Sequence, residues 1–264
     1  SISQLFIAGV LPGILLAALF SGYIMLWALR HPEQVPAADV RMSFMQKLSE
    51  SRSLIPVVLL IAAVLGSIYT GFATATEAAA VGVVGSLVLS AVQGSMTWGT
   101  FKDSLMGATR LYCMIALILA GAAFLTLAMG YIGLPRHLAE WIASLGLNQA
   151  QLIVALAVFY IILGCFLDGI SMVVLTMGVL MPTVQAAGID TIWFGIFIVL
   201  VVEMAQITPP VGFNLFVLQG MTGRQLPWIA KVALPMFLLM CLAVVLLYVF
   251  PGIVTWLPQQ MSAR

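Results

Sequence analysis

Long apolar segments recur along the whole chain, and they constrain its fold more than any other feature. Hydrophobic residues make up 63% of the 264 residues, whereas charged residues make up only 7%. A soluble domain usually carries about 25% charged residues, so a chain this poor in charge could not cover its own surface in water. Lipid must therefore be the solvent for most of it. We predict an all-α integral membrane protein with several helices.

The apolar segments differ in length, which predicts an irregular set of helices. A spanning helix needs about 20 apolar residues. Residues 54–91 are long enough for two spans, with a break predicted at Gly71, whereas residues 170–181 are too short to cross alone. The other expected segments are residues 5–29, 105–129, 151–166, 193–207, 211–220 and 232–257.

The basic residues orient these segments and favour a re-entrant hairpin. Cytoplasmic loops are enriched in Lys and Arg. If the polar residues 30–53 are cytoplasmic and residues 151–181 enter and leave on one side, most of the ten basic residues face the cytoplasm. A simple crossing would move Arg224 and Lys231 outside. We therefore expect a hairpin over 151–181 and a broken helix over 193–220.

These segments predict four regions of the chain. They are a first helix with a cytoplasmic linker (1–53), membrane helices of a scaffold or arm type (54–149), a transport-type region that holds the hairpin and the broken helix (150–231), and a C-terminal membrane helix (232–264).

Three acidic residues lie within the apolar segments: Glu77, Asp168 and Glu203. No Lys or Arg lies deep in a segment to pair with them. An acid in the hydrocarbon core costs at least a few kcal/mol, which makes each of them a functional candidate. A net acidic interior needs cations or protons.

Two of these acids belong to predicted helix starts. Thr74, Ala75, Thr76 and Glu77 have the S/T-x-x-E form of a capping box. Asp168 is a favourable N-cap residue, and Gly169 and Ser171 follow it.

A third helix start is predicted at Thr208-Pro209-Pro210. This sequence places a threonine at the N-cap position and a proline at the first helical position. The two prolines also remove backbone donors, which argues against an unbroken helix. Gly212 and Asn214 then add flexibility and a polar side chain near the break.

A hairpin tip that faces this break would build an ion or substrate site. Broken helices in transporters offer N–H groups to anions and freed carbonyls to sodium. Four side chains would supply hard oxygen ligands: Asp168, Ser171, Thr208 and Asn214.

Each motif also has a purely structural interpretation. Glu77 would then only cap a helix, Glu203 would pair with a backbone donor or face cytoplasmic water, Asp168 would be a turn residue, and Thr208-Pro209-Pro210 would be a kink. The cysteines lie far apart and both histidines are in predicted loops, so we expect no metal cluster and no cofactor.

Four motifs share their order and spacing with one transporter family. They are residues 68–80 (IYTGFATATEAAA), residues 164–168 (GCFLD), Pro182 with residues 188–190 and 194–195, and residues 208–216 (TPPVGFNLF). With these motifs the sequence resembles the C-terminal part of the large membrane (M) subunit of tripartite ATP-independent periplasmic (TRAP) transporters. The resemblance extends across nearly the whole chain.

The resemblance implies an elevator-type carrier of the bacterial inner membrane that is driven by sodium. The substrate would be an organic acid, of the C4-dicarboxylate or sialic acid type, delivered by a periplasmic (P) binding protein. A small four-helix membrane (Q) subunit would complete the complex. The chain would hold the second inverted repeat, with a sodium site drawn from Asp168, Gly169, Ser171, Thr208, Pro209 and Gly212. Candidates for the substrate site or the helix breaks are Pro210, Asn214, Thr74, Thr76 and Glu77.

The chain departs from the family in two ways. The first repeat is missing, so we expect the chain to be a fragment or to work with an N-terminal half on another chain. The sequence Glu203-Met-Ala-Gln206 also precedes the Thr-Pro-Pro motif, where the family commonly has a glycine and little charge.

Three alternative functions can be weighed against sodium-coupled uptake. A proton-coupled carrier would use Glu77, Asp168 and Glu203 as proton sites. An intramembrane aspartyl protease needs two facing aspartates, and only Asp168 is deep, so we expect no enzyme and no catalytic residue. An assembly subunit without its own site would tolerate substitution of Asp168 or Thr208.

Overall fold

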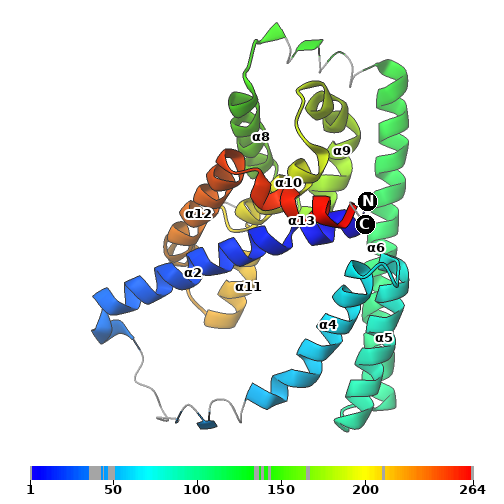
Figure 1. Ribbon diagram of the computed structural model, residues 1–264, viewed down its shortest axis with the longest axis vertical. Coiled ribbons are helices and arrows are strands. Elements are labelled where there is room, and N and C mark those ends of the chain that lie inside the picture. The colour runs from blue at the N-terminus through cyan, green and yellow to red at the C-terminus, as the bar shows by residue number, and fades with distance from the viewer. Residues whose placement is uncertain are drawn as a thin grey trace. The chain divides into compact units, whose positions relative to one another are not determined.

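The computed structural model describes residues 2–35, 43, 45–46, 51–133, 137, 140–141, 144–164, 167–209 and 212–262. These residues form helices and connecting turns, without a strand among them (Figure 1). Five of the described helical segments are long and apolar enough to span a membrane. They are Ile2–Arg30, Ala75–Val92, Trp98–Met129, Gly169–Ala186 and Leu226–Val249. The predicted all-α membrane fold is therefore confirmed.

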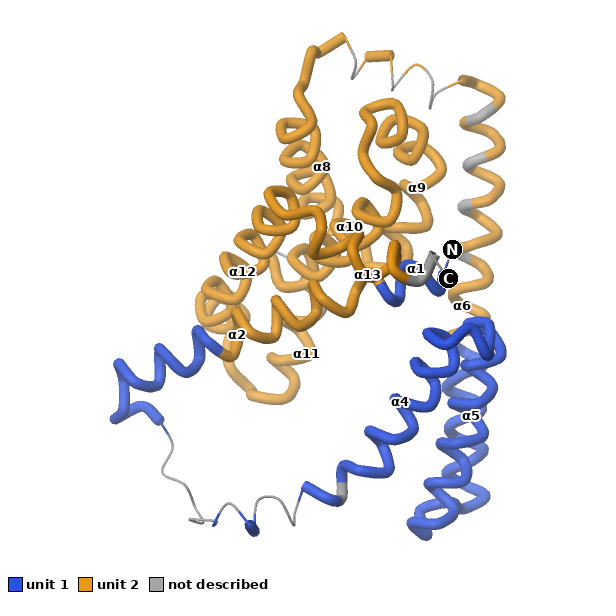
Figure 2. Tube along the Cα trace, viewed as in Figure 1, with its two compact units in different colours: residues 1–7, 22–110 blue, residues 8–21, 111–264 orange. Residues whose placement is uncertain are grey.

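The helices run in this order: α1 (Ile2–Ala8), α2 (Val10–Arg30), α4 (Ile55–Tyr69), α5 (Ala75–Val92), α6 (Trp98–Ile132), α8 (Gln149–Leu163), α9 (Gly169–Ala186), α10 (Thr191–Gln206), α11 (Phe213–Thr222), α12 (Leu226–Val249) and α13 (Gly252–Ser262). Short 3₁₀ turns lie at Pro32–Gln34 and Arg52–Leu54. The chain divides into two compact units, residues 1–7 with 22–110 and residues 8–21 with 111–264, called unit 1 and unit 2 (Figure 2).

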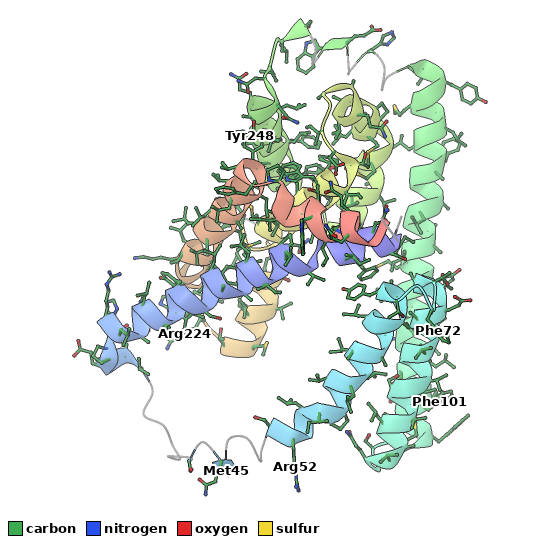
Figure 3. The ribbon with its side chains drawn as sticks, in the orientation of Figure 1. Met45, Arg52, Phe72, Phe101, Arg224 and Tyr248 are labelled. Carbon is green, nitrogen blue, oxygen red and sulfur yellow. The ribbon has the colours of Figure 1, made fainter. Side chains whose placement is uncertain are left out.

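Unit 1 is built on a helical hairpin of α4 and α5. The predicted break lies at residues 70–74, where Gly71 adopts a φ of +71° that favours glycine. Phe72, in the same turn, is 90% exposed (Figure 3). A Cβ atom at Gly85 would overlap Leu60 of α4, so the small residue permits close helix packing of the kind common in membranes.

Unit 2 is built around α10, which is buried on most of its surface. Its buried residues include Phe194, Phe197, Val201 and Ala205. A helix that is apolar all round is expected in the interior of a bundle. α10 packs against α8, α9, α12 and α13 (Figure 1), and part of α2 adds side chains such as Phe20 to the same core.

A proline explains one polar contact in this core. Pro251 has no N–H to give to the carbonyl of Leu247, one helical turn earlier. The indole Nε1–H of Trp193 donates to that carbonyl instead, at 2.9 Å, and ties α10 to α12. The same proline overturns the prediction of one closing helix over 232–257, because Phe250 leaves the helical conformation and α12 and α13 are separate.

In the predicted hairpin, α8 ends at Leu163 and α9 begins at Gly169. The hydroxyls of Tyr160 in α8 and Thr176 in α9 hydrogen-bond at 2.6 Å across the pair. α9 continues through Pro182 to Ala186, so the prediction of a helix too short to cross was wrong. Thr183 and Val184, which follow the proline, are buried. The re-entrant path stays a prediction, as do the four predicted regions.

Candidate functional site

Asp168 forms the tip of the α8–α9 pair and caps α9, as predicted. Its Oδ2 accepts hydrogen bonds from the backbone N–H groups of Ile170 and Ser171, each at 3.1 Å, and its Oδ1 accepts one from the Ser171 hydroxyl. These bonds engage the amides that a helix N-terminus would otherwise present to a ligand. The start of α9 is therefore already paired with the Asp168 carboxylate of the same chain.

The predicted break separates α10, which ends at Gln206, from α11, which begins at Phe213. Pro210, predicted to lie at the break, is outside the described residues. Pro209 lies within the break and is exposed. The existence of the break is confirmed.

The prediction that Thr208 caps the second helix was wrong. The N-cap residue of α11 is Gly212, and no side chain caps that helix. Thr208 prolongs the end of α10 instead, because its hydroxyl donates to the carbonyl of Met204 at 2.6 Å and its N–H donates to Ala205 at 3.2 Å. A Cβ atom at Gly212 would lie 2.9 Å from the carbonyl oxygen of Thr208, so only glycine fits there.

The carbonyl groups of Gln206 and Ile207 lie where α10 ends at the break. Among the described residues, no backbone N–H donates to the carbonyl of Gln206 or Ile207. Pro210 could not do so, since it has no N–H, and it stands where the donor to Gln206 would be. The C-terminal end of a helix also carries a partial negative charge. This end of α10 therefore attracts cations.

Two glycines bring the hairpin tip against this end of α10. A Cβ atom at Gly164 would overlap the Cβ of Ala205. A Cβ atom at Gly169 would lie 2.8 Å from Cγ1 of Val202 and 3.3 Å from Nε2 of Gln206. The hairpin tip and the helix break therefore form one place in unit 2, called here the junction: residues 164, 167–171, 202–209 and 212–214.

The junction contains several polar oxygen atoms, and none of its residues is basic. It contains the Asp168 carboxylate, the Ser171 and Thr208 hydroxyls, and the carbonyls of Gln206 and Ile207, to which no described backbone N–H donates. The sequence has no Lys or Arg between residues 136 and 224. Hard oxygen ligands around a negative charge are the arrangement that alkali and alkaline-earth cations prefer.

Glu203 and Asn214 face each other from opposite sides of the break. The Asn214 amide donates to the Glu203 carboxylate at 3.5 Å, a long contact between α10 and α11. Glu203 is exposed and Asn214 is half-buried. The sequence analysis considered a backbone donor, cytoplasmic water or a proton for Glu203, and in the structure this acid contacts an uncharged side chain at the break.

Thr74, Thr76 and Glu77 belong to unit 1, whereas the junction lies in unit 2. The predicted capping box is confirmed. The N–H of Thr74 donates to the Glu77 carboxylate at 2.7 Å, and the N–H of Glu77 donates to the Thr74 hydroxyl at 3.3 Å. Thr76 is exposed. The cap is a structural role for Glu77, and its contribution can be tested.

Replacing Glu77 by alanine is expected to lower the melting temperature of the purified permease by about a few degrees, because two hydrogen bonds of the cap are lost. Glutamine also completes a capping box, so Glu77→Gln is expected to retain both stability and uptake. The measurement is thermal unfolding in detergent, beside uptake in proteoliposomes. A stable Glu77→Gln variant that fails to transport would give the carboxylate a role beyond the cap.

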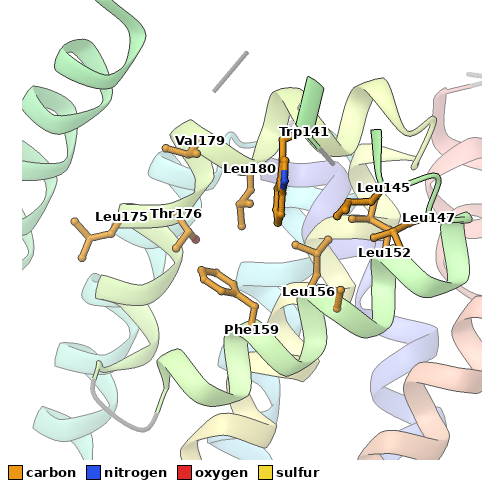
Figure 4. A pocket seen from close by; sticks show the side chains of 11 residues that line it. Trp141, Leu145, Leu147, Leu152, Leu156, Phe159, Leu175, Thr176, Val179 and Leu180 are labelled. Atoms are coloured by element: carbon orange, nitrogen blue, oxygen red, sulfur yellow. The ribbon is translucent and has the colours of Figure 1, made fainter. Parts of the chain in front are cut away.

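An apolar cleft of about 440 Å³ lies between α8 and α9, away from the tip (Figure 4). Its one polar side chain besides the Trp141 indole is Thr176, whose hydroxyl already bonds Tyr160. Among the residues that the structure describes, the lining offers no charged group to an organic acid, which argues against a substrate site here. The lining residues are Trp141, Leu145, Leu147, Leu152, Ala155, Leu156, Phe159, Leu175, Thr176, Val179 and Leu180.

The sequence interpretation missed two contributors to the junction. Gly164 belongs to one of the family motifs, but the sequence did not predict its contact with α10. Gln206 was identified only as part of a departure from the family pattern. Gln206 is one of the few buried polar residues among those described. The available signal was a polar side chain in an apolar helix just before a break.

Comparison with known proteins gives one family and several relatives. Residues 1–253 match the family described as "Tripartite ATP-independent periplasmic transporter, DctM component". The C4-dicarboxylate TRAP transporter large permease protein of Pseudomonas aeruginosa is 30% identical over 259 residues, which are 98% of this chain and 60% of that protein.

Two further relatives have other substrates in their names. The sialic acid TRAP transporter large permease protein of Vibrio cholerae is 28% identical, over 98% of this chain and 60% of that protein. The ectoine/5-hydroxyectoine TRAP transporter large permease protein of Ruegeria pomeroyi is 33% identical, over 97% of this chain and 60% of that protein. The chain thus spans about 60% of the length of these relatives.

Proposed function

Because the chain belongs to the DctM component family of tripartite ATP-independent periplasmic transporters, we propose that it forms part of a sodium-coupled permease for organic acids and holds one of its ion sites. The family is one of transporter components rather than enzymes, and the chain is a multi-pass protein of the bacterial inner membrane. Sodium coupling, substrate and partners are the parts of this function that need experiment.

The junction is the observation that carries the proposal. The Asp168 carboxylate and the carbonyls at the end of α10, which no described N–H group pairs, provide negative charge and hard oxygen atoms, and no basic residue of the surrounding sequence competes with a cation. Sodium binds at such helix ends in transporters built from discontinuous helices. The coupling ion would be held by Asp168, Ser171 and Thr208 together with backbone oxygens.

The substrate anion would bind at the other side of the break. The start of α9 is paired with Asp168, but no side chain caps the start of α11. The N–H groups of a helix start and the positive end of the helix dipole favour a carboxylate there. Asn214 lies in the first turn of α11. Its amide would donate to the substrate by exchanging the long 3.5 Å contact with Glu203 for a contact with the anion. One break would then hold a cation at the end of α10 and an anion at the start of α11.

The class of substrate is inferred from the relatives. Their names give C4-dicarboxylates, sialic acid and ectoines. We propose an organic acid of the dicarboxylate or sialic acid type. A periplasmic binding protein would deliver it, and a small four-helix membrane subunit and the N-terminal part of the large permease would complete the transporter. The hairpin and broken helix would move together as the mobile part of an elevator.

Uptake of organic acids in proteoliposomes tests this function. The full-length permease would be reconstituted with its small subunit and binding protein, with and without an inward sodium gradient. Uptake is expected to require sodium and to persist when the pH gradient is collapsed. Uptake driven equally well by a pH gradient alone would reject sodium coupling and favour a proton carrier, with Glu77 and Glu203 as the next residues to replace.

A further inference from the structure

A small polar cavity of unit 2, called here the end cavity, lies where four helices begin or end. α9 ends at Ala186 and α12 ends at Val249, whereas α8 begins at Gln149 and α10 begins at Thr191. The cavity has a volume of about 200 Å³ and lies at the opposite end of α10 from the junction. Its lining residues are Gln149, Ile153, Gly188, Ile189, Asp190, Trp193, Tyr248, Pro251 and Thr255.

The helix ends indicate that the end cavity lies at a membrane surface. α9 and α12 are both long and apolar enough to span a membrane, and both end beside the cavity. Trp193 and Tyr248 line it, and these two residue types are enriched where membrane helices meet the headgroup layer. Tyr248, near the end of α12 (Figure 3), is 37% exposed. Lipid headgroups are therefore the molecules nearest to this cavity.

The charge of the end cavity favours a cationic group. One oxygen of Asp190 accepts the N–H of Trp193 at 2.8 Å, and no described residue donates to the other oxygen. The sequence has no Lys or Arg between residues 136 and 224 or between residues 231 and 264, so no basic residue near the lining in sequence balances this acid. Side chains also cap both helices that begin here, Asn148 for α8 and Asp190 for α10. An anionic headgroup would therefore meet an acid without a compensating base.

Two aromatic rings line the end cavity together with this carboxylate. The Trp193 ring stacks on Phe197 with a centroid distance of 5.6 Å, and it meets Tyr248 edge-to-face with a centroid distance of 6.5 Å. The bond from the Trp193 indole to the carbonyl of Leu247, at 2.9 Å, holds this ring in place. An ammonium group is attracted to aromatic rings and also donates hydrogen bonds to a carboxylate. The lining therefore combines the two kinds of group that bind an ammonium ion.

We propose that the end cavity binds the ammonium group of a phospholipid headgroup, of the kind that phosphatidylethanolamine carries. The second oxygen of Asp190 would accept hydrogen bonds from the ammonium, and the rings of Trp193 and Tyr248 would contact it. The amide of Gln149 would donate to the lipid phosphate, while the acyl chains stay in the bilayer. This lipid would link the turn between α9 and α10 to the end of α12. The site is separate from the junction, so the inference does not depend on sodium coupling.

Native mass spectrometry of the delipidated full-length permease tests the proposal. Phosphatidylethanolamine is expected to bind at least about fivefold more tightly than phosphatidylglycerol with the same acyl chains, because only the first headgroup carries an ammonium. Equal affinity for the two lipids would overturn the proposal. Free ethanolamine carries the same ammonium without the acyl chains. If it binds as tightly as the lipid, the cavity is a site for soluble amines, and the assignment to a lipid is overturned.

Two substitutions locate this preference in the end cavity. Asp190→Asn removes the charge but keeps a side chain that caps helices about as well, so the two lipids are expected to bind within about twofold of each other. Tyr248→Leu removes one ring at an exposed position without touching the cap, and it is expected to reduce the preference about twofold to threefold. The sodium dependence of uptake should not change in either variant, because the junction is at the other end of α10.

Two residues of α6 provide matched controls for these substitutions. Asp103→Asn and Tyr131→Leu change an exposed acid and an exposed tyrosine away from the end cavity, and both should keep the full lipid preference. Thermal unfolding of each variant in detergent checks that the fold is retained. If Asp190→Asn and Tyr248→Leu both fold and both keep the full preference for phosphatidylethanolamine, the lipid binds elsewhere and the proposal is overturned.

Discussion

Replacing Asp168 by asparagine is expected to raise the half-saturating sodium concentration of uptake by at least about tenfold while the hairpin stays folded. Asparagine caps helices about as well as aspartate, so the bonds from Ile170 and Ser171 can be retained. The change therefore removes the negative charge of the tip without removing the cap. Uptake as a function of sodium, beside thermal unfolding in detergent, measures both quantities on one preparation.

The chain contains a matched control for this experiment. Asp190 caps α10 in the same manner, since its carboxylate accepts the N–H of Trp193 at 2.8 Å, but it lies at the opposite end of α10 from the junction. Asp190→Asn is expected to leave sodium dependence unchanged. Equal effects of the two substitutions would mean that capping rather than cation binding explains the Asp168 result. Normal sodium dependence in Asp168→Asn would remove this carboxylate from the site.

The parts of the site that depend on neighbouring residues were predictable from the sequence. The caps formed by Thr74 with Glu77 and by Asp168 with Ser171 each join residues three apart, so residue type and spacing contain most of the information. The break after α10 was predictable for a similar reason, because two consecutive prolines remove the donors that would continue the helix.

The Thr208 cap failed because two local rules compete at that position. Threonine before proline favours a helix start, but a threonine that follows an apolar helix can also bond back to the carbonyl four residues earlier. In the structure Thr208 donates to Met204 and the start of the next helix moves to Gly212. Which rule prevails depends on the packing of α10 against other helices. This packing cannot be deduced from the residues adjacent to Thr208.

Contacts between segments far apart in the chain could not be predicted from the sequence. The apolar pattern of α10 does not reveal which face meets the hairpin, because the helix is apolar on nearly all sides. The pairing of Gly164 with Ala205, and the room that Gly169 gives to Gln206, become visible only when α8, α9 and α10 are placed together. These contacts are also where single substitutions should have large structural effects.

Gly164→Ala is expected to separate the hairpin tip from α10 and to impair both stability and uptake. The added Cβ would overlap the Cβ of Ala205 and would lie 3.4 Å from its Cα and 3.3 Å from the carbonyl oxygen of Tyr160. None of these atoms belongs to a flexible side-chain end, so the helices themselves must shift. Overpacking of this kind costs about 1–3 kcal/mol. Gly220→Ala in α11 is the control, because a Cβ there meets nothing within 4 Å.

Ala205→Gly is expected to rescue Gly164→Ala, because it removes the atom with which the new methyl group collides. On its own, Ala205→Gly should cost about 0.5–1 kcal/mol through the flexibility of glycine in a helix. The double variant should then be more stable than Gly164→Ala alone, with uptake restored in parallel. Strictly additive losses would show that the two residues do not interact. Restored stability without restored uptake would instead show that the packing of the hairpin on α10 can be recovered while the geometry required for cation binding is not.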